Sequence, residues 1–172
     1  VYVEPFGGSF AVGLSLPKSD GAKYRKVFND VDHHLSNFFQ VLRNRPEELI
    51  KAINLTPYSR YDFDKAVEYI HSDTDFSLEN PVEWARNFLI FNRQSMFGKE
   101  DGSWCISREG ENIAQTWDNL PCMMNEVAKL FHGTFIECDD YKKIISRWDS
   151  PSTVFYVDPP YLDVEKDFYH AN

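Results

Sequence analysis

Apolar and polar positions follow two different periods along the N-terminal part of the chain. Val1–Val3 and Lys23–Phe28 are short runs rich in apolar and aromatic residues, and they predict buried strands. Ala11–Leu16 and His33–Asn44 instead carry apolar residues at helical spacing. Pro46, which two glutamates follow, starts a further short helix, because proline and acidic side chains both favour a first helical turn. This order of strands and helices predicts a parallel sheet that helices cover.

The C-terminal part returns to the same alternation. Asn119–Phe131 is an amphipathic helix, Thr134–Glu137 is a strand, and Asp139–Trp148 is again helical. Thr153–Val157 is rich in β-branched and aromatic residues, which predicts the best strand of the chain. The fold class that we expect is therefore α/β, with a Rossmann-like parallel sheet.

The segment between these two parts interrupts the alternation. Tyr61–Ile70 and Pro81–Phe91 have the pattern of helices, whereas Asn92–Thr116 is rich in Gly, Ser, Arg and Trp and has only weak periodicity. We therefore predict a mainly helical insert in the α/β domain. At 172 residues, the chain fits one domain that carries such an insert.

The charge of the chain limits how it can bind nucleic acid. A net charge of −9 argues against a general polyanion binder, so a local basic patch is needed for DNA binding. The insert holds the best candidates for such a patch, which are Arg93, Gln94, Lys99 and Arg108. Glutamates and aspartates lie among them, so a solvated loop is the alternative interpretation.

Cysteines and histidines point to no further chemistry. The three cysteines are widely spaced without a CxxC pair, which favours a reduced, cytoplasmic setting over a disulfide framework. The histidines lack metal-ligand spacing, so we expect no metal. The sequence has neither a signal peptide nor an apolar run of about 18 residues, so we expect no membrane association.

Two turns at strand ends are candidates for binding a ligand. The first predicted strand runs into Gly7-Gly8, and the second ends at Asn29-Asp30. The carboxyl ends of parallel strands meet at one edge of a sheet, so these turns should lie side by side. A glycine turn lets a ligand approach the backbone, and a carboxylate on the neighbouring strand can accept hydrogen bonds from a ribose. The GxGxxG spacing of dinucleotide sites is absent.

The strand Thr153–Val157 ends in Asp158-Pro159-Pro160-Tyr161, which resembles the catalytic motif of amino-group DNA methyltransferases. The resemblance implies that Asp158 and the Pro159 carbonyl accept the two hydrogens of the target amine, which frees the nitrogen lone pair. Pro160 stiffens the turn. Tyr161 offers a face on which a base flipped out of the duplex can stack. The cysteines are not needed as nucleophiles.

The other motifs resemble the Dam-type DNA adenine-N6 methyltransferases. Val3–Ser9 resembles their methyl-donor motif, Asn29–Asp32 the motif whose acid holds the donor's ribose, and Cys138–Tyr141 the motif near the donor's adenine. Thr56–Arg60 and Asn92–Ser95 resemble segments of phage-type members. The resemblance covers nearly the whole chain, and it implies a class I methyltransferase sheet with a DNA-recognition insert.

Several expectations follow from this resemblance. The donor should be S-adenosylmethionine, the partner double-stranded DNA, the protein a monomer, and its location the cytoplasm of a bacterial or phage-infected cell. The segments would be a donor-binding half (1–54), the recognition insert (55–118) and a catalytic half (119–172). The residues that the resemblance assigns to donor binding are Pro5, Phe6, Gly7, Gly8, Ser9, Asp30, Val31, Asp140 and Tyr141.

The chain departs from the family pattern at three places. Phe10 stands where the pattern has Gly. Either the turn needs a positive φ here, so that Phe10 is strained or crowds the donor, or the ring packs between sheet and helix; we expect the former, and with it tighter donor binding in Phe10→Gly. A Gly-Gly-Lys loop before Val1 and strands after Tyr161 are missing, so we expect an incomplete sheet, an open edge at Thr153–Val157, and a piece of a longer protein.

Two other functions fit part of this pattern. An amino-cytosine DNA methyltransferase shares donor and mechanism, although Ser is more frequent there at the position of Asp158. Phe10 gives weight to a catalytically impaired remnant that still binds donor or DNA. Protein-glutamine and RNA methyltransferases use a related turn, but Asp158 and the insert argue against them.

Overall fold

The computed structural model describes residues 1–16, 24–72, 79–96, 103–107 and 109–160. Its centre is a four-stranded parallel sheet with the order β3-β2-β1-β4. The strands are β1 (Tyr2–Glu4), β2 (Lys26–Asn29), β3 (Thr134–Glu137) and β4 (Val154–Phe155). The predicted α/β class with a parallel sheet is therefore confirmed.

The direction of chain progression reverses between β1 and β4. The chain moves from β1 to β2 and on to β3, and then returns to place β4 on the free side of β1. Val3 pairs with Val27 on one side and with Phe155 on the other. In parallel α/β sheets the crevice beyond the carboxyl ends at such a switch point is the usual place for a ligand. The fold thus directs attention to the turns that follow β1 and β4.

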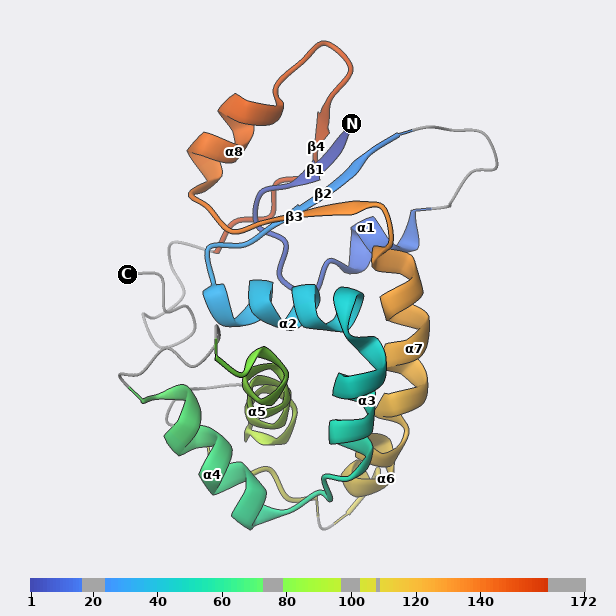
Figure 1. Ribbon diagram of the computed structural model, residues 1–172, viewed down its shortest axis with the longest axis vertical. Coiled ribbons are helices and arrows are strands. Elements are labelled where there is room, and N and C mark those ends of the chain that lie inside the picture. Colours follow the sequence, from blue (N-terminus) through green and yellow to red (C-terminus); the bar gives the residue numbers. More distant parts are fainter. Residues whose placement is uncertain (17–23, 73–78, 97–102, 108, 161–172) are drawn as a thin grey trace.

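Helices cover both faces of the sheet (Figure 1). Helix α8 (Tyr141–Trp148) lies on one face, where its buried Ile144 packs with Val3 and Val27. The other face carries α1 (Ala11–Ser15), α2 (His33–Asn44) and α7 (Leu120–Phe131). Helices on both sides explain why β1 and β2 are largely buried on both of their faces.

The remaining helices form a body below the sheet, with α5 at its centre between α2, α3 and α4 (Figure 1). Their bounds are α3 (Pro46–Asn54), α4 (Arg60–Ile70), α5 (Pro81–Gln94) and α6 (Ile113–Asp118). Local chemistry starts α5, because the side chain of Asn80 accepts from the backbone N–H of Glu83 and Pro81 occupies the first turn.

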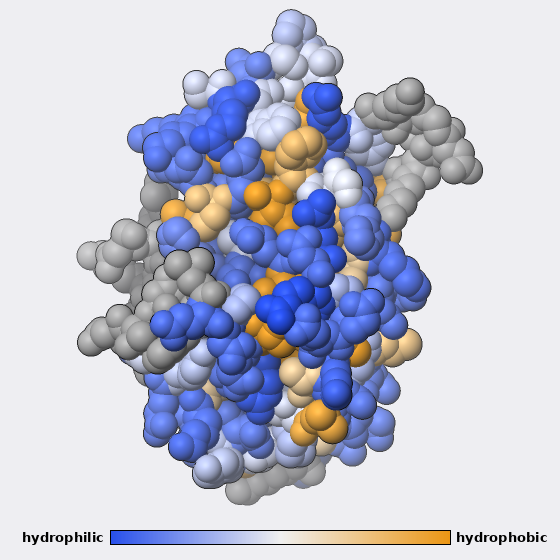
Figure 2. Space-filling model, in the orientation of Figure 1, coloured by the Kyte–Doolittle hydropathy of each residue, from blue (hydrophilic) through white to orange (hydrophobic). Residues whose placement is uncertain are grey.

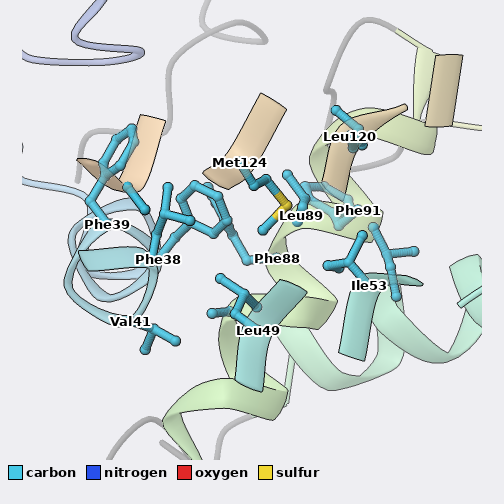
Figure 3. Close-up of a cluster of buried hydrophobic side chains, with 14 of the residues drawn as sticks. Phe38, Phe39, Val41, Leu49, Ile53, Phe88, Leu89, Phe91, Leu120 and Met124 are labelled. Carbon is cyan, nitrogen blue, oxygen red and sulfur yellow. The ribbon is translucent and has the colours of Figure 1, made fainter. Parts of the chain in front are cut away.

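One hydrophobic core joins the insert to the rest of the molecule. Side chains of α2, α3, α5 and α7 meet in it (Figure 3). The same cluster includes Phe10 and Phe28 at the sheet and Trp117 in α6. Residues 55–118, the predicted insert, and residues 1–54 therefore stabilise each other through shared apolar burial.

Three local predictions were wrong. Helix α5 continues to Gln94, and α6 forms inside the stretch predicted to be irregular, where the side chain of Asn112 caps it by accepting from the Gln115 N–H. The strand expected over Thr153–Val157 is only two residues long. Among the described strands it pairs with β1 alone, so it lies at one edge of the described sheet.

The face of the molecule in the orientation of Figure 1 is largely polar. Figure 2 shows one face, on which hydrophilic residues dominate and hydrophobic residues reach the surface mainly in a narrow central band. Within the described ranges, none of the helices combines the length and the apolar character that crossing a membrane requires.

Candidate active site

Asn29 connects the loops that leave three neighbouring strands. Its side-chain amide donates to the carbonyl of Pro5 (2.8 Å) and to that of Asp139 (3.0 Å), and its Oδ1 accepts from the Asp139 N–H (3.0 Å). The side chain is fully buried, so the loss of these hydrogen bonds would leave buried polar atoms unpaired, which is costly in free energy. The sequence alone predicts no separate role for Asn29. The available signal was an amide directly after the apolar residues Val27 and Phe28.

The glycine turn is attached to the end of β2, as predicted. The Gly7 N–H donates to the Asn29 carbonyl (2.7 Å), and the Gly8 N–H donates to Asp30 Oδ2 (2.9 Å). A Cβ on Gly7 would lie 2.4 Å from the ring of Phe28, so only glycine fits there. Gly8 has a φ of 48° and open space around it, which leaves its backbone accessible to a ligand.

Phe10 combines a strained backbone with a buried ring. Its φ is 55°, in the left-handed region, so the expectation that this turn requires a positive φ is confirmed. The expectation that the ring crowds the donor is wrong. The ring is fully buried and lies 5.4 Å from the ring of Phe28 and 5.5 Å from that of Phe131. Gly13 makes room for it, because a Cβ there would come within 2.4 Å of the Phe10 ring.

Asp30 offers a carboxylate at the rim. Its Oδ1 accepts from the Asp32 N–H (3.0 Å), and its Oδ2 accepts from Gly8. Each carboxylate oxygen can accept a further hydrogen bond. Burial raises the pKa of Asp30 above its ordinary value, although the two backbone N–H groups partly offset this effect. Its neighbour Val31 is 55% exposed, which is unusual for a valine and leaves an apolar surface beside the carboxylate.

Aromatic rings lie at the same rim. The rings of Phe6 and Tyr141 are 5.0 Å apart and tilted by 34°, although they come from the turn after β1 and the start of α8. Asp140 caps α8 by accepting from the Lys142 N–H (2.9 Å). The donor-motif residues of three separate segments are thus brought together at one edge of the sheet.

A buried carboxylate lies beneath the turn. Glu4 Oε1 accepts from the Tyr2 hydroxyl (2.6 Å) and from the Gly13 N–H (2.7 Å), and Glu4 is only 2% exposed. Lys26 Nζ donates to the carbonyl of Gly13 (2.6 Å), so both residues hold α1 on the sheet. Burial raises the pKa of Glu4, and the negative charge of Asp158 acts in the same direction.

The Asp-Pro-Pro turn follows β4 and therefore lies at the switch point. The Tyr156 N–H donates to the Val3 carbonyl (2.9 Å), which aligns the end of β4 with the end of β1. Asp158, Pro159 and Pro160 are exposed, as a group that must reach a large substrate would be. Tyr161 lies outside the described residues.

The four candidates for DNA contacts differ in where they lie. Arg93 is exposed at the end of α5. Gln94 is fully buried, with its Oε1 accepting from Trp104 Nε1 (3.2 Å), so the prediction that it touches DNA does not agree with this arrangement. Helical spacing explains the difference, because adjacent residues point to different sides of a helix. Lys99 and Arg108 lie outside the described residues.

One of the three cysteines reaches the rim, where the Sγ of Cys138 donates to the Val31 carbonyl (3.8 Å). Cys105, Cys122 and Cys138 are free thiols. In the described part of the chain, no three His, Cys, Asp or Glu side chains are grouped in a way that could hold a metal ion.

The fold and this rim define the chain as a protein of the Rossmann-like methyltransferase class. Comparison with protein families gives the particular group. The model of the D12 class N6 adenine-specific DNA methyltransferases matches residues 1–171, and the chain belongs to this family. The family favours adenine over cytosine as the target. No curated protein is significantly similar to the chain.

Proposed function

We propose that this protein transfers a methyl group from S-adenosylmethionine to the exocyclic amino group of adenine in double-stranded DNA. The observation that carries the proposal is the position of the Asp158-Pro159 turn. It follows the strand next to β1, at the switch point where the glycine turn and Asp30 also lie. Acceptors for an amine and a surface for a nucleoside therefore share one edge of the sheet.

The rim has the groups that a sulfonium nucleoside requires. Asp30 would accept hydrogen bonds from the ribose, while Val31, Phe6 and Tyr141 provide apolar and aromatic surface for the adenine. The bare Gly8 lets the methionine part approach the backbone. When bound, S-adenosylmethionine supplies a methyl group on a positively charged sulfur.

Asp158 and Pro159 would act on the target amine. The lone pair of an aromatic amine is delocalised into the ring, which makes the nitrogen a poor nucleophile. A carboxylate of Asp158 and the carbonyl of Pro159 can accept the two amine hydrogens and draw the nitrogen toward a tetrahedral shape. The ring of Pro160 restricts the preceding residue, so the Pro159 carbonyl is held in one direction.

The target base has to leave the duplex to reach this edge. The exposed turn at Asp158 can meet an extruded base but not one that is stacked within the helix. Tyr161, directly after the turn, is our candidate for the residue on which the base stacks. Arg93, exposed at the end of α5, is the candidate for a contact with the duplex.

Methyl transfer to DNA tests the proposal directly. We expect label from S-adenosylmethionine to appear in duplex DNA, with N6-methyladenine as the modified base and its flanking sequence read by sequencing. Methylcytosine, or donor and DNA binding without transfer, would contradict it. The burial of Phe10 removes the steric reason for an impaired remnant.

Asp30→Ala is expected to weaken donor binding. The loss should be about 1.5–3 kcal/mol, the scale for hydrogen bonds to a charged group. Isothermal titration calorimetry measures it, and the isosteric Asp30→Asn should show a loss in the same direction. Asp32→Asn is the matched control, because it removes a charge from the same turn while asparagine still caps α2. If all variants bind the donor with equal affinity, the ribose does not bind at Asp30.

The pH dependence gives this prediction a second readout. Burial raises the pKa of Asp30, so as the pH is lowered this carboxylate should become protonated at a higher pH than an exposed aspartate does. Donor affinity should fall over the same pH range. This dependence should be absent in Asp30→Asn, whose side chain does not titrate. Unfolding at low pH would instead lower the donor affinity of wild type and of Asp30→Asn alike.

Arg93→Gln is expected to weaken DNA binding and to flatten its salt dependence. Loss of one phosphate contact reduces the slope of log K against log salt by about one. If Arg93 reads a base, specificity at that position also falls by about 1–3 kcal/mol. Fluorescence anisotropy over a salt series measures both effects. Lys51→Gln on the exposed side of α3 controls for net charge, and equal slopes for Arg93→Gln and wild type would place Arg93 on a solvated face.

A further inference from the structure

The side chain of Asn29 uses both its donor and its acceptor groups inside the protein. Its Nδ2 donates to the carbonyls of Pro5 and Asp139, while its Oδ1 accepts from the Asp139 N–H. The side chain is fully buried, so it contacts no solvent. A side-chain amide suits this position because it combines two donor hydrogens with an acceptor oxygen, which a carboxylate, a hydroxyl or an apolar group does not.

This side chain bridges two loops that do not bond to each other. The turn after β1 and the loop after β3 lie on opposite sides of β2, because the sheet has the order β3-β2-β1-β4. In the part of the chain that the structure describes, no hydrogen bond joins residues 5–9 directly to residues 138–141. The separation of the two loops is therefore set from the end of β2, where Asn29 binds both.

Each of the two loops carries an aromatic ring close to the point where Asn29 binds. Phe6 directly follows Pro5, and Tyr141 lies two residues after Asp139. The centroids of these two rings are 5.0 Å apart, although β1 and β3 are not neighbours in the sheet. A shift of either backbone segment moves its ring, because only one or two residues separate the ring from the bonded carbonyl. Asn29 thus fixes the backbone beneath both rings.

The loop after β3 is also held by α8, but less firmly. Asp139 Oδ1 accepts from Lys143 Nζ (2.9 Å), and Asp139 Oδ2 accepts from Arg147 Nη2 (3.2 Å). Both ion pairs are exposed to solvent, and exposed pairs contribute little to stability. The buried hydrogen bonds of Asn29, whose loss leaves polar groups unpaired, therefore decide the position of this loop more than the ion pairs do.

We propose that Asn29 is a positioning residue for the methyl donor, which sets the spacing between the Phe6 and Tyr141 rings and thereby the donor affinity. The inference rests on the proposed function, in which both rings contact the donor's adenine. Asn29 touches no ligand itself, because its side chain is buried beneath the rim. It makes no hydrogen bond to the described residues of the Asp158 turn, so its loss weakens donor binding and leaves transfer at saturating donor unchanged.

Asn29→Asp is the sharpest variant, because it keeps the shape and the acceptor for the Asp139 N–H but replaces the donor group by an oxygen. That oxygen would face the carbonyls of Pro5 and Asp139, which repel it. Asn29→Ser is the second variant, which shortens the side chain without adding a charge. The matched control is Asn87→Asp, the same change in a buried amide of α5 whose Nδ2 donates to Glu83 Oε1 (3.3 Å).

The experiment measures the Kd of S-adenosylmethionine by calorimetry, transfer to duplex DNA at saturating donor, and the melting temperature of each protein. For Asn29→Asp and Asn29→Ser we expect the donor Kd to rise roughly tenfold, the scale for the loss of such hydrogen bonds. The kcat at saturating donor should stay at the wild-type value. Asn87→Asp should bind the donor as wild type does, whatever its melting temperature.

A double variant separates positioning from general support of the fold. If Asn29 acts through the ring of Tyr141, Asn29→Ser should cost less donor affinity in Tyr141→Leu than in wild type. Additive losses, an equal loss in Asn87→Asp, or an unchanged Kd in a folded Asn29 variant would each overturn the inference while the proposed function stands.

Hydrogen exchange tests the wild type itself and does not depend on whether a variant folds. The Asp139 N–H should exchange slowly before any donor is added, because Asn29 Oδ1 holds it. Fast exchange that slows only with S-adenosylmethionine would overturn the inference, because the donor would then order this loop. Wild type that binds the donor but does not methylate DNA contradicts the proposed function alone, and wild type that does not bind the donor contradicts both.

Discussion

Asp158→Ala is expected to lower the rate of methyl transfer by more than about a hundredfold, because it removes an acceptor that acts on the amine in the transition state. Donor affinity should remain close to wild type, since Asp158 lies on the turn after β4, whereas the residues proposed to bind the donor lie after β1, β2 and β3. Single-turnover transfer to DNA measures the rate, and calorimetry measures donor binding.

Two variants sharpen this test. Asp158→Asn keeps the shape but replaces one acceptor oxygen by a donor, so it should also be severely impaired. Asp149→Ala removes an exposed carboxylate from the end of α8, ahead of β4, and should leave the rate unchanged. Near-normal transfer by Asp158→Ala would remove Asp158 from the chemistry and leave the rim as a binding site only.

The largest effect on stability is expected at Phe10. Phe10→Ala empties a site among Phe28 and Phe131, and removal of a buried phenyl ring costs about 3–5 kcal/mol. Phe10→Gly should be less harmful by roughly 1 kcal/mol, because glycine relieves the left-handed backbone that alanine retains. The free energy of unfolding from urea titrations should therefore rank wild type above Gly and Gly above Ala.

Donor binding to the same proteins decides what Phe10 does. Because the ring lies in the core, Phe10→Gly should not tighten donor binding. This reverses the expectation from the sequence. Gly13→Ala checks independently that the Phe10 ring lies in the core. It should lower the stability of wild type, where its Cβ collides with the Phe10 ring, more than that of Phe10→Ala, where the ring is absent. Tighter binding in Phe10→Gly would show that the ring reaches the donor after all.

Local patterns in the sequence determined much of the fold. Helical and strand periods placed the sheet and most helices, because a parallel sheet buried on both faces leaves a strong apolar signal. The helix predicted to begin at Pro81 does begin there, since a helix start depends on neighbouring residues. The glycine turn and Asp30 were expected to be adjacent, and the bond from Gly8 to Asp30 confirms it, because strand direction alone brings such turns to one edge.

The contacts that hold the candidate site together could not be predicted from local sequence patterns. Asn29 holds the loops of Pro5 and Asp139 across more than a hundred residues of sequence, and no local pattern encodes such a partner. The two-residue extent of β4 depends on which neighbours it finds in the sheet, not on its own β-branched residues.

Phe10 shows most clearly which properties are predictable from the sequence and which depend on the tertiary structure. The sequence, through its resemblance to the family motif, predicted a positive φ at this turn, because glycine normally fills this position of the motif. Only the tertiary structure decided where the ring goes, because the space between Phe28 and Phe131 exists only when α7 and the sheet come together, with a bare Cα at Gly13. Backbone conformation is a local property, whereas the direction of a buried side chain is set by the packing of distant segments.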